Sequence, residues 1–496
     1  MGLLESTILR NTSRIGICAL LLLGLSTAAL ADEHKQEKKS SPHKIMAPAR
    51  AASNGQHAGG PAQAGHPGGP AMGGGAQAGR SSGPAMGGGA QAGRFNSGAS
   101  RGQAMPKGAS VGRTPSGANV MRRADGHVAM VHNERTGITV QRGLNGSRMV
   151  VAERPDHSRV VVTRPGFGYV QRPYTYRGHE FASRVYVRGG VTYNRVYGRY
   201  AWRGAYINPY FPGRYYRPAF YSWAYYPWAA PVSFGWGWGG AGWYAYYGPY
   251  FRPYPVYAAP AYWLTDYLIA ESLQAAYAEQ QADNSKVLNI PPEEAQQNAT
   301  ALTPETKELI AEEVKRQVAL ENAESTQVQQ GSPDDASSSI QRMLTDGVAH
   351  VFVAGQYLDL VDSNGTECTL SDGDAVQLGQ NDAGATDINV VVLASKGGRE
   401  CGKGATVSVT LEELQEMQNH MREIIDRGMD ELQKKQGTAG LPAAPKDAQA
   451  APTDSPLATI APPAPPADEV KNELTQEQKA ADAEEQAASQ ASTTPQ

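Results

Sequence analysis

The aromatic residues of this chain are concentrated in one stretch, which constrains the fold more than any other feature. All seven tryptophans lie between Trp202 and Trp263, and 23 of the 24 tyrosines lie between Tyr169 and Tyr277. Proline and glycine interrupt residues 210–263 throughout, so an irregular backbone is predicted there. Because large aromatic side chains need burial or a partner, two interpretations stay open. The segment is either an irregular core on the neighbouring strands or an exposed adhesive, sugar-stacking surface.

Charge is divided between the two halves of the chain. Residues 121–264 hold 18 arginines, no lysine and five acidic residues, which gives a net charge of +13. Residues 265–496 hold 15 basic and 39 acidic residues, which gives −24. A basic segment of this size favours an anionic partner. The alternative is that the basic half and the acidic half dock on each other within the chain.

The first residues read as a bacterial signal peptide. Arg10 and Arg14 form a positively charged region before an apolar run from Ile15 to Leu25. Ala29-Leu30-Ala31 fits a cleavage site. The apolar run is shorter than the roughly 20 residues that a membrane-spanning helix needs. We therefore expect export to the periplasm, the cell envelope or the outside of the cell, with no transmembrane span in the mature chain.

Cleavage after Ala31 removes Cys18 and leaves two cysteines, Cys368 and Cys401. An even pair in an oxidising compartment predicts a disulfide. The alternative is two free, buried thiols.

A mixed α and β fold with long disordered regions is predicted. Turn signals recur about every ten residues after Val120, which is typical of an antiparallel meander. The repeated string GPAMGGGAQAGR marks the preceding segment as low in complexity. In chain order, the predicted regions are a signal peptide (1–31), a disordered Gly/Ala/Pro-rich tether (32–119), an Arg/Tyr-rich antiparallel β region (120–209), the Tyr/Trp/Pro/Gly-rich segment (210–263), a helical connector and linker (264–339), a compact domain of strands closed by a C-terminal helix (340–436) and a disordered tail (437–496).

Two helix starts can be placed from the sequence. Thr303 followed by Pro304 is an N-cap with proline at the first helical position. Thr410 and Glu413 form a capping box before a stripe of leucine, methionine and isoleucine at helical spacing. This stripe is predicted to be core.

One hairpin of the β region suggests a binding face. A two-residue turn at Gly189-Gly190 places arginines opposite each other and tyrosines opposite each other on one face. Opposed arginines repel unless an anion or an aromatic ring lies between them. The face therefore binds an anion or is a solvated face with arginine stacked on tyrosine. The candidate binding residues are Arg184, Tyr186, Arg188, Tyr193, Arg195, Tyr197 and Arg199. Anionic polysaccharide, an anionic lipid surface and extracellular nucleic acid are the ligand classes that suit such residues.

The most specific alternative is a copper or nickel site at the N-terminus of the mature chain. If cleavage follows Ala31, the mature chain begins Asp32-Glu33-His34. An N-terminal amine, two backbone amides and an imidazole at the third position can hold Cu(II) or Ni(II) in a square plane. A chance histidine is the competing interpretation, and no other cofactor is implied.

No catalytic residue is assigned. The G-x-S-x-G match at 108–112 lies in a Gly/Ser-rich stretch, and the segment GGRECGKG at 397–404 lacks the Ser or Thr that a P-loop requires. An exported hydrolase remains an alternative, with catalytic residues that are distant in the sequence and are brought together only by the fold. A deep pocket that joins His350 or His420 to carboxylates would favour it.

Two stretches carry a resemblance. The aromatic stretch Phe220–Gln274, and residues 302–432 with HVFVAGQYLDL and LASKGGREC, resemble a family of uncharacterised exported bacterial proteins. That family has a Tyr/Trp/Pro/Gly-rich central segment and a small C-terminal β-plus-helix domain. The resemblance implies export and a shared architecture, and it transfers no functional residue. Together these observations favour a non-enzymatic exported protein that binds an anionic polymer or a cell surface.

Overall fold

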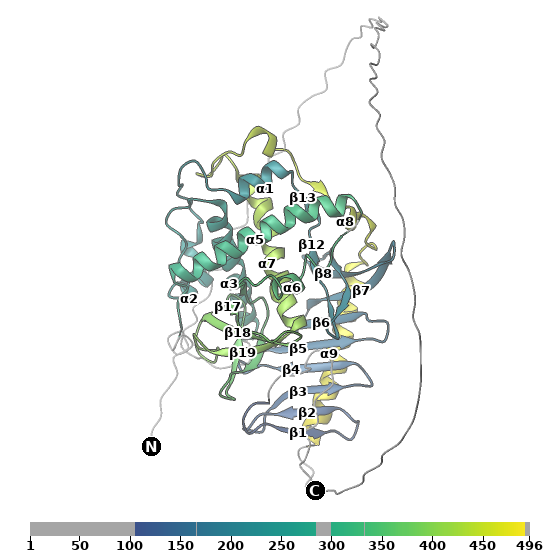
Figure 1. Cartoon of the computed structure of the whole chain (residues 1–496). Coiled ribbons are helices and arrows are strands. Elements are labelled where there is room, and N and C mark those ends of the chain that lie inside the picture. The colour runs from purple at the N-terminus through teal and green to yellow at the C-terminus, as the bar shows by residue number, and fades with distance from the viewer. Residues whose placement is uncertain (1–104, 165, 284–298, 332, 492–496) are drawn as a thin grey trace, which may run out of the picture. The chain divides into compact units, whose positions relative to one another are not determined.

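The computed structural model describes residues 105–164, 166–283, 299–331 and 333–491. The predicted signal peptide, most of the predicted tether and the candidate metal residues Asp32, Glu33 and His34 lie outside these ranges. The architecture is mixed, as the sequence predicts. A ten-stranded antiparallel sheet is followed along the chain by helices and several small sheets (Figure 1).

The large sheet is a meander of successive hairpins. Its strands, in spatial order, are β1 (Ser110–Arg113), β2 (Asn119–Arg122), β3 (Val128–Asn133), β4 (Ile138–Arg142), β5 (Arg148–Glu153), β6 (Arg159–Arg164), β7 (Phe167–Tyr176), β8 (His179–Arg188), β9 (Val191–Gly198) and β12 (Tyr210–Phe211). The expected hairpin register is present, with Tyr186 opposite Tyr193 and Arg184 opposite Arg195. Gly189 and Gly190 have positive φ angles of 60° and 81°, which a two-residue turn of this kind requires.

The sheet begins earlier than predicted. Strand β1 starts at Ser110, inside the stretch assigned to the disordered tether. Its four residues are all exposed, and Val111 is its one large apolar side chain. Such an edge strand is held by backbone pairing to β2 and not by burial. It therefore lacks the hydrophobic pattern by which strands are identified in a sequence.

A helix from the predicted tail covers one face of the meander. Helix α9 (Ala467–Gln490) runs across strands β3 to β8 (Figure 1). Its buried side chains pack on a row of valines that point to one face of the sheet. These side chains are Val470, Leu474, Ala481 and Ala488 of α9, and Val120, Val131, Val140, Val150, Val160, Val162, Val170 and Val185 of the strands.

The expectation of a disordered tail over 437–496 is therefore wrong for α9. The composition of this helix is polar and alanine-rich, which is typical of disorder when no partner is considered. Its few apolar residues recur on one face of the helix, and that face packs on the valines of the sheet. The sheet supplies the burial that the helix alone cannot provide.

Ion pairs flank this contact along the length of α9. Arg154 binds Glu473 and Glu477, and Arg148 binds Asp482 and Glu485. Further pairs join Arg142 to Glu485 and Arg172 to Glu473. The basic β region and the acidic C-terminal region therefore contact each other directly.

We expect α9 to detach from the sheet at high ionic strength before the rest of the protein unfolds. Salt screens partly exposed ion pairs. Helix α9 itself contributes only two large side chains, Val470 and Leu474, to the apolar contact. Limited proteolysis in about 0.05 M and about 1 M NaCl should show faster cleavage within 467–490 at the higher salt. Equal cleavage rates would show that apolar packing alone holds the helix.

Most of the aromatic segment belongs to a core, although Tyr225 and Tyr226 are 37% and 60% exposed. Trp263, Tyr257, Phe220 and Phe251 are completely buried. They belong to one core cluster whose members run from Ile207 to Ala448. Its elements include α1 (Pro218–Tyr225), the short 3-10 helix η1 (Trp238–Gly240), α2 (Gly242–Tyr247), α3 (Pro260–Asp283) and α5 (Pro304–Gln329). The proline-rich backbone still forms short helices because Pro218 and Pro260 stand at helix starts, where proline is tolerated.

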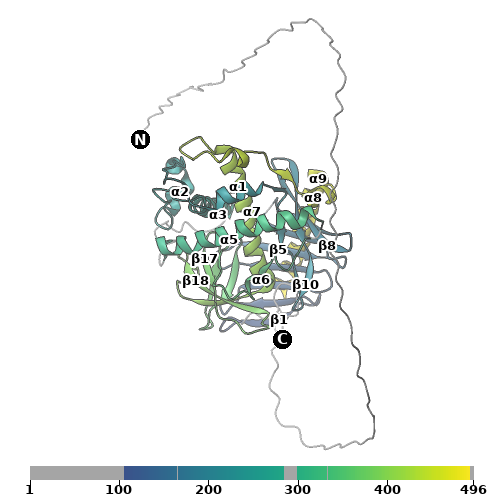
Figure 2. The same cartoon turned by 45° about the horizontal axis from the view of Figure 1, so that its top comes forward.

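The predicted compact domain at 340–436 shares this aromatic core. Its elements are α6 (Ile340–Met343), β14 (Val351–Val353), β15 (Leu358–Val361), β16 (Glu367–Leu370), β17 (Ala375–Leu378), β18 (Asp387–Ala394), β19 (Thr406–Thr410) and α7 (Leu411–Lys435). Helices α3, α5 and α7 pack against one another (Figure 2). Both α5 and α7 begin at the predicted caps, Thr303 and Thr410.

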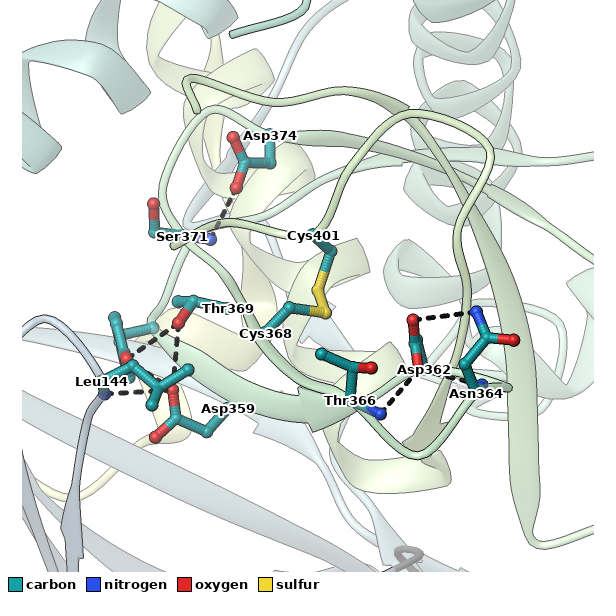
Figure 3. Close-up of a disulfide and its surroundings, with 11 residues drawn as sticks. Leu144, Asp359, Asp362, Asn364, Thr366, Cys368, Thr369, Ser371, Asp374 and Cys401 are labelled. Atoms are coloured by element: carbon teal, nitrogen blue, oxygen red, sulfur yellow. Dashed lines mark hydrogen bonds between the residues drawn. A yellow bond between two sulfur atoms is a disulfide. The ribbon is translucent and has the colours of Figure 1, made fainter. Parts of the chain in front are cut away.

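The remaining elements are short. They are β10 (Tyr200–Trp202), β11 (Ala205–Ile207), β13 (Arg214–Tyr215), the 3-10 helix η2 (Lys446–Ala448), β20 (Thr453–Asp454) and α8 (Pro456–Ile460). Cys368 of β16 and Cys401, which precedes β19, form the predicted disulfide (Figure 3). None of the helices in the described ranges combines the length and the apolar composition that a bilayer span requires.

Candidate binding face on strands β7 to β9

Three tyrosines form a ladder across the longest strands of the meander. Tyr169 of β7 pairs with Tyr186 of β8, which pairs with Tyr193 of β9. The ring centroids of Tyr169 and Tyr186 are 5.4 Å apart, and those of Tyr186 and Tyr193 are 5.2 Å apart. The register of the two hairpins therefore places the three rings side by side on one face of the sheet. We call these residues the tyrosine ladder.

Helix α7 covers the inner end of this face. Arg184 is 2% exposed, and its Nη1 donates to Glu416 Oε2 of α7 at 2.7 Å. Its Nε donates to Gln171 at 2.7 Å, and its guanidinium lies 4.0 Å from the ring centroid of Tyr197. Arg184 is therefore enclosed by a carboxylate, an amide and aromatic rings.

The opposed arginine is held in the same way. Arg195 pairs with Glu423 of α7, and the Tyr197 hydroxyl donates to the same carboxylate. The guanidinium of Arg195 lies 5.1 Å from the ring centroid of Tyr186. Glu416 and Glu423 thus supply the anions that two opposed arginines need. The chain's own helix occupies the place where the sequence suggested an external anion.

These contacts shift the pKa values of the buried groups. Burial on its own would raise the pKa of Glu416, but the Arg184 guanidinium outweighs burial and lowers it. Burial raises the pKa of Tyr197 well above its usual range, and the Glu423 carboxylate raises it further. At neutral pH the Tyr197 hydroxyl is therefore neutral, and Glu416 carries the negative charge that pairs with Arg184.

Arg199 lies one residue beyond the end of β9 at Gly198, and its backbone N–H donates to the Glu180 carbonyl at 3.0 Å. Its Nη1 pairs with Glu180 at 2.6 Å, and its guanidinium stacks 3.8 Å from the ring centroid of Tyr206.

The outer end of the face is open. Arg188 is exposed, and Phe167, Val191 and Tyr193 are 51%, 68% and 38% exposed. The guanidinium of Arg164 stacks 3.8 Å from the ring centroid of Phe167. Within the part of the chain that the structure describes, no carboxylate pairs with Arg188. We call Arg164, Phe167, Tyr186, Arg188 and Tyr193 the open patch.

Of the two histidines considered for catalysis, His350 is buried and His420 is half-buried. His350 Nδ1 lies 2.8 Å from Glu313 Oε2, and its Nε2 lies 3.0 Å from Asp346 Oδ2. His420 Nε2 lies 2.8 Å from the Ser272 hydroxyl, and burial lowers the pKa of His420 to about 3. Both imidazoles therefore serve as hydrogen-bonding groups inside the core.

A cavity of about 250 Å³ lies elsewhere, between the β7–β8 turn, the end of α5 and α8. Tyr176, His179 and Leu457 line it, and neither His350 nor His420 does. No group of His, Cys, Asp and Glu side chains in the described ranges is arranged to hold a metal ion.

The α7 carboxylates were not identified from the sequence. Glu416 and Glu423 are seven residues apart on a helix whose start was predicted, so they share one face. Two acidic residues seven positions apart on a predicted helix, together with a strand pair that carries two arginines, are the sequence signal from which this pairing could have been predicted.

Comparisons with protein-family models, with curated proteins and with solved structures give no match. The resemblance to a family of exported bacterial proteins therefore stays a prediction, and a functional conclusion rests on the geometry of this chain.

Proposed function

We propose that this is a non-enzymatic exported protein of the cell envelope or extracellular space that binds an anionic polysaccharide through the open patch. The observation that carries the proposal is the contrast along one face of the sheet. Arg184 and Arg195 have carboxylate partners from α7, whereas Arg188 has none among the described residues. The outer end of the tyrosine ladder lies beside this unpaired cation.

The inner end of the same face supports the choice of ligand. There, a carboxylate binds a guanidinium that also stacks on tyrosine rings. An acidic sugar offers the same two features, because its carboxylate accepts from guanidinium and its C–H face packs on an aromatic ring. Among the described residues, no carboxylate pairs with the arginine at the outer end, where a tyrosine ring lies beside it.

Export is supported by two features of different kinds. Residues 1–31 have the pattern of a signal peptide. The disulfide between Cys368 and Cys401 suits an oxidising compartment, because such bonds are rare in the cytosol.

The test is retention of the protein on an immobilised uronic-acid polymer such as alginate. We expect retention to fall with rising salt. Arg188→Gln should weaken it roughly tenfold, because one charge-assisted hydrogen bond is lost. Tyr193→Ala should also weaken it, because the ring on which the sugar packs is lost. Arg217→Gln is the matched control, since Arg217 is also exposed and the change in charge is identical.

Equal retention of the wild-type protein and Arg188→Gln would refute the proposal. A neutral polymer such as dextran should retain none of the variants. Stronger retention on DNA or on anionic vesicles than on alginate would assign the patch to a different class of ligand.

A further inference from the structure

A second cluster of charged residues lies away from the binding face, beside the disulfide. Lys396 Nζ is 2.6 Å from Asp374 Oδ1 and 3.1 Å from Glu400 Oε1. The Asp374 side chain has no solvent exposure, and those of Lys396 and Glu400 are 7% and 12% exposed. One amine and two carboxyl groups are thus enclosed together in the core.

Hydrogen bonds fix both carboxyl groups. The Ser371 backbone N–H donates to Asp374 Oδ2 at 2.8 Å (Figure 3), and the Ser371 hydroxyl donates to Glu400 at 2.6 Å. The buried Tyr250 hydroxyl donates to the Gly373 carbonyl at 2.8 Å, next to Asp374. The Asp374 and Glu400 carboxyl groups therefore have little freedom to turn away from the Lys396 amine.

The protonation states follow from burial and charge. Burial raises the pKa of Asp374 well above its usual range, and the Glu400 carboxylate raises it further. Burial alone would lower the pKa of Lys396, but Asp374 and Glu400 outweigh it and raise that pKa. Both shifts favour the protonated forms, which are the neutral Asp374 carboxyl group and the Lys396 ammonium.

We propose that Lys396 and Asp374 join in an intramolecular isopeptide bond, with Glu400 as the catalytic proton acceptor. Glu400 takes a proton from the Lys396 ammonium, and the free amine attacks Cγ of the protonated Asp374 carboxyl. A C–N bond forms. The Asp374 hydroxyl receives the proton from Glu400 and leaves as water, and Glu400 then takes a second proton from the nitrogen. The products are an amide, one water molecule and a neutral Glu400.

Enclosure makes this condensation feasible without an activating co-reactant. Groups held in a near-attack geometry react with effective concentrations far above those reachable in solution. A buried pair also lacks the bulk water that would hydrolyse the product. The bond would close the chain between residues 374 and 396, inside the loop that the disulfide closes between Cys368 and Cys401.

The protein contains its own control pair. Lys307 Nζ also lies 2.6 Å from a buried aspartate, Asp266 Oδ1. The other oxygen of Asp266 accepts from the Tyr254 N–H and the Tyr257 hydroxyl. In the described part of the chain, no second carboxylate pairs with Lys307. Without a proton acceptor at the amine, this pair should stay an ion pair.

Peptide mapping of the purified, reduced full-length protein tests the proposal. We expect a branched peptide that joins Asp374 to Lys396, lighter than its two parts by about 18 Da, the mass of the water lost when the tethered groups condense. Trypsin should fail to cleave after Lys396. Lys307 and Asp266 should be recovered in unmodified linear peptides.

Two variants separate catalysis from folding. Glu400→Gln should abolish the branched peptide while the Cys368–Cys401 disulfide still forms. Asp374→Asn should yield the same branch with loss of ammonia, about 17 Da, because the leaving group alone has changed. Recovery of wild-type Lys396 only in linear peptides would overturn the proposal. So would a branch that survives Glu400→Gln.

Discussion

Deletion of residues 462–496, which removes α9, is expected to lower the free energy of unfolding by about 4 kcal/mol and to make the protein self-associate. The magnitude follows from losing the burial of Val470 and Leu474, at roughly 1.5–3 kcal/mol for each fully buried large side chain. The self-association follows because the exposed valine row becomes a continuous apolar face. Urea denaturation followed by circular dichroism measures the first effect, and size-exclusion chromatography measures the second.

A point variant refines this test. Leu474→Gln removes the largest buried side chain of α9 and keeps every ion pair to the sheet, so it should reproduce much of the loss in stability. Gln476→Ala, at an exposed position of the same helix, is the control and should leave stability unchanged. If the deletion leaves both stability and oligomeric state unaltered, α9 does not cover the sheet in solution.

Glu416→Leu is expected to cost about 3–5 kcal/mol of folding stability, because it leaves the Arg184 guanidinium buried without its carboxylate. The double variant Arg184→Met/Glu416→Leu should recover most of that loss, since a buried ion pair can be replaced by apolar side chains at little cost. Glu431→Leu is the control, because Glu431 lies on the exposed side of α7 with Lys434 and Lys435.

The pair also gives a pH dependence with a definite sign. Because Arg184 lowers the pKa of Glu416 in the folded state, the pair stabilises the protein above the unfolded pKa of a glutamate. That contribution is lost as the pH falls through the lowered value. The stability of the wild-type protein relative to the double variant should therefore fall in acid. A single variant as stable as the double one would show that Arg184 is solvated instead of buried.

Local signals in the sequence were sufficient for several elements. The turn glycines and the alternation of residues predicted the register of the β8–β9 hairpin, and the caps at Thr303 and Thr410 placed two helix starts. The cysteine pair predicted the disulfide. In each of these cases the residues that determine the feature are near in sequence or are chemically unique.

Contacts between distant segments could not be predicted in the same way. Whether the tryptophans form a core or a surface depends on α3, α5 and α7 packing around them, and no periodicity in 210–263 reveals that. Likewise, Arg184 finds its carboxylate in Glu416, 232 positions along the chain. The predicted register of β8 and β9 is present, but which arginines of this hairpin stay open to solvent depends on where α7 lies.

The place of α9 in the chain has a consequence for the order of folding. Strands β1 to β9 are complete once residue 198 has been synthesised, yet the helix that covers their valines begins only at residue 467. The apolar face of the nascent meander therefore stays uncovered by α9 until almost all of the remaining chain has been synthesised. Closing so distant a contact is slow, and the open face invites misassembly meanwhile. This separation delays the contact between the sheet and α9 until synthesis of the chain is nearly finished.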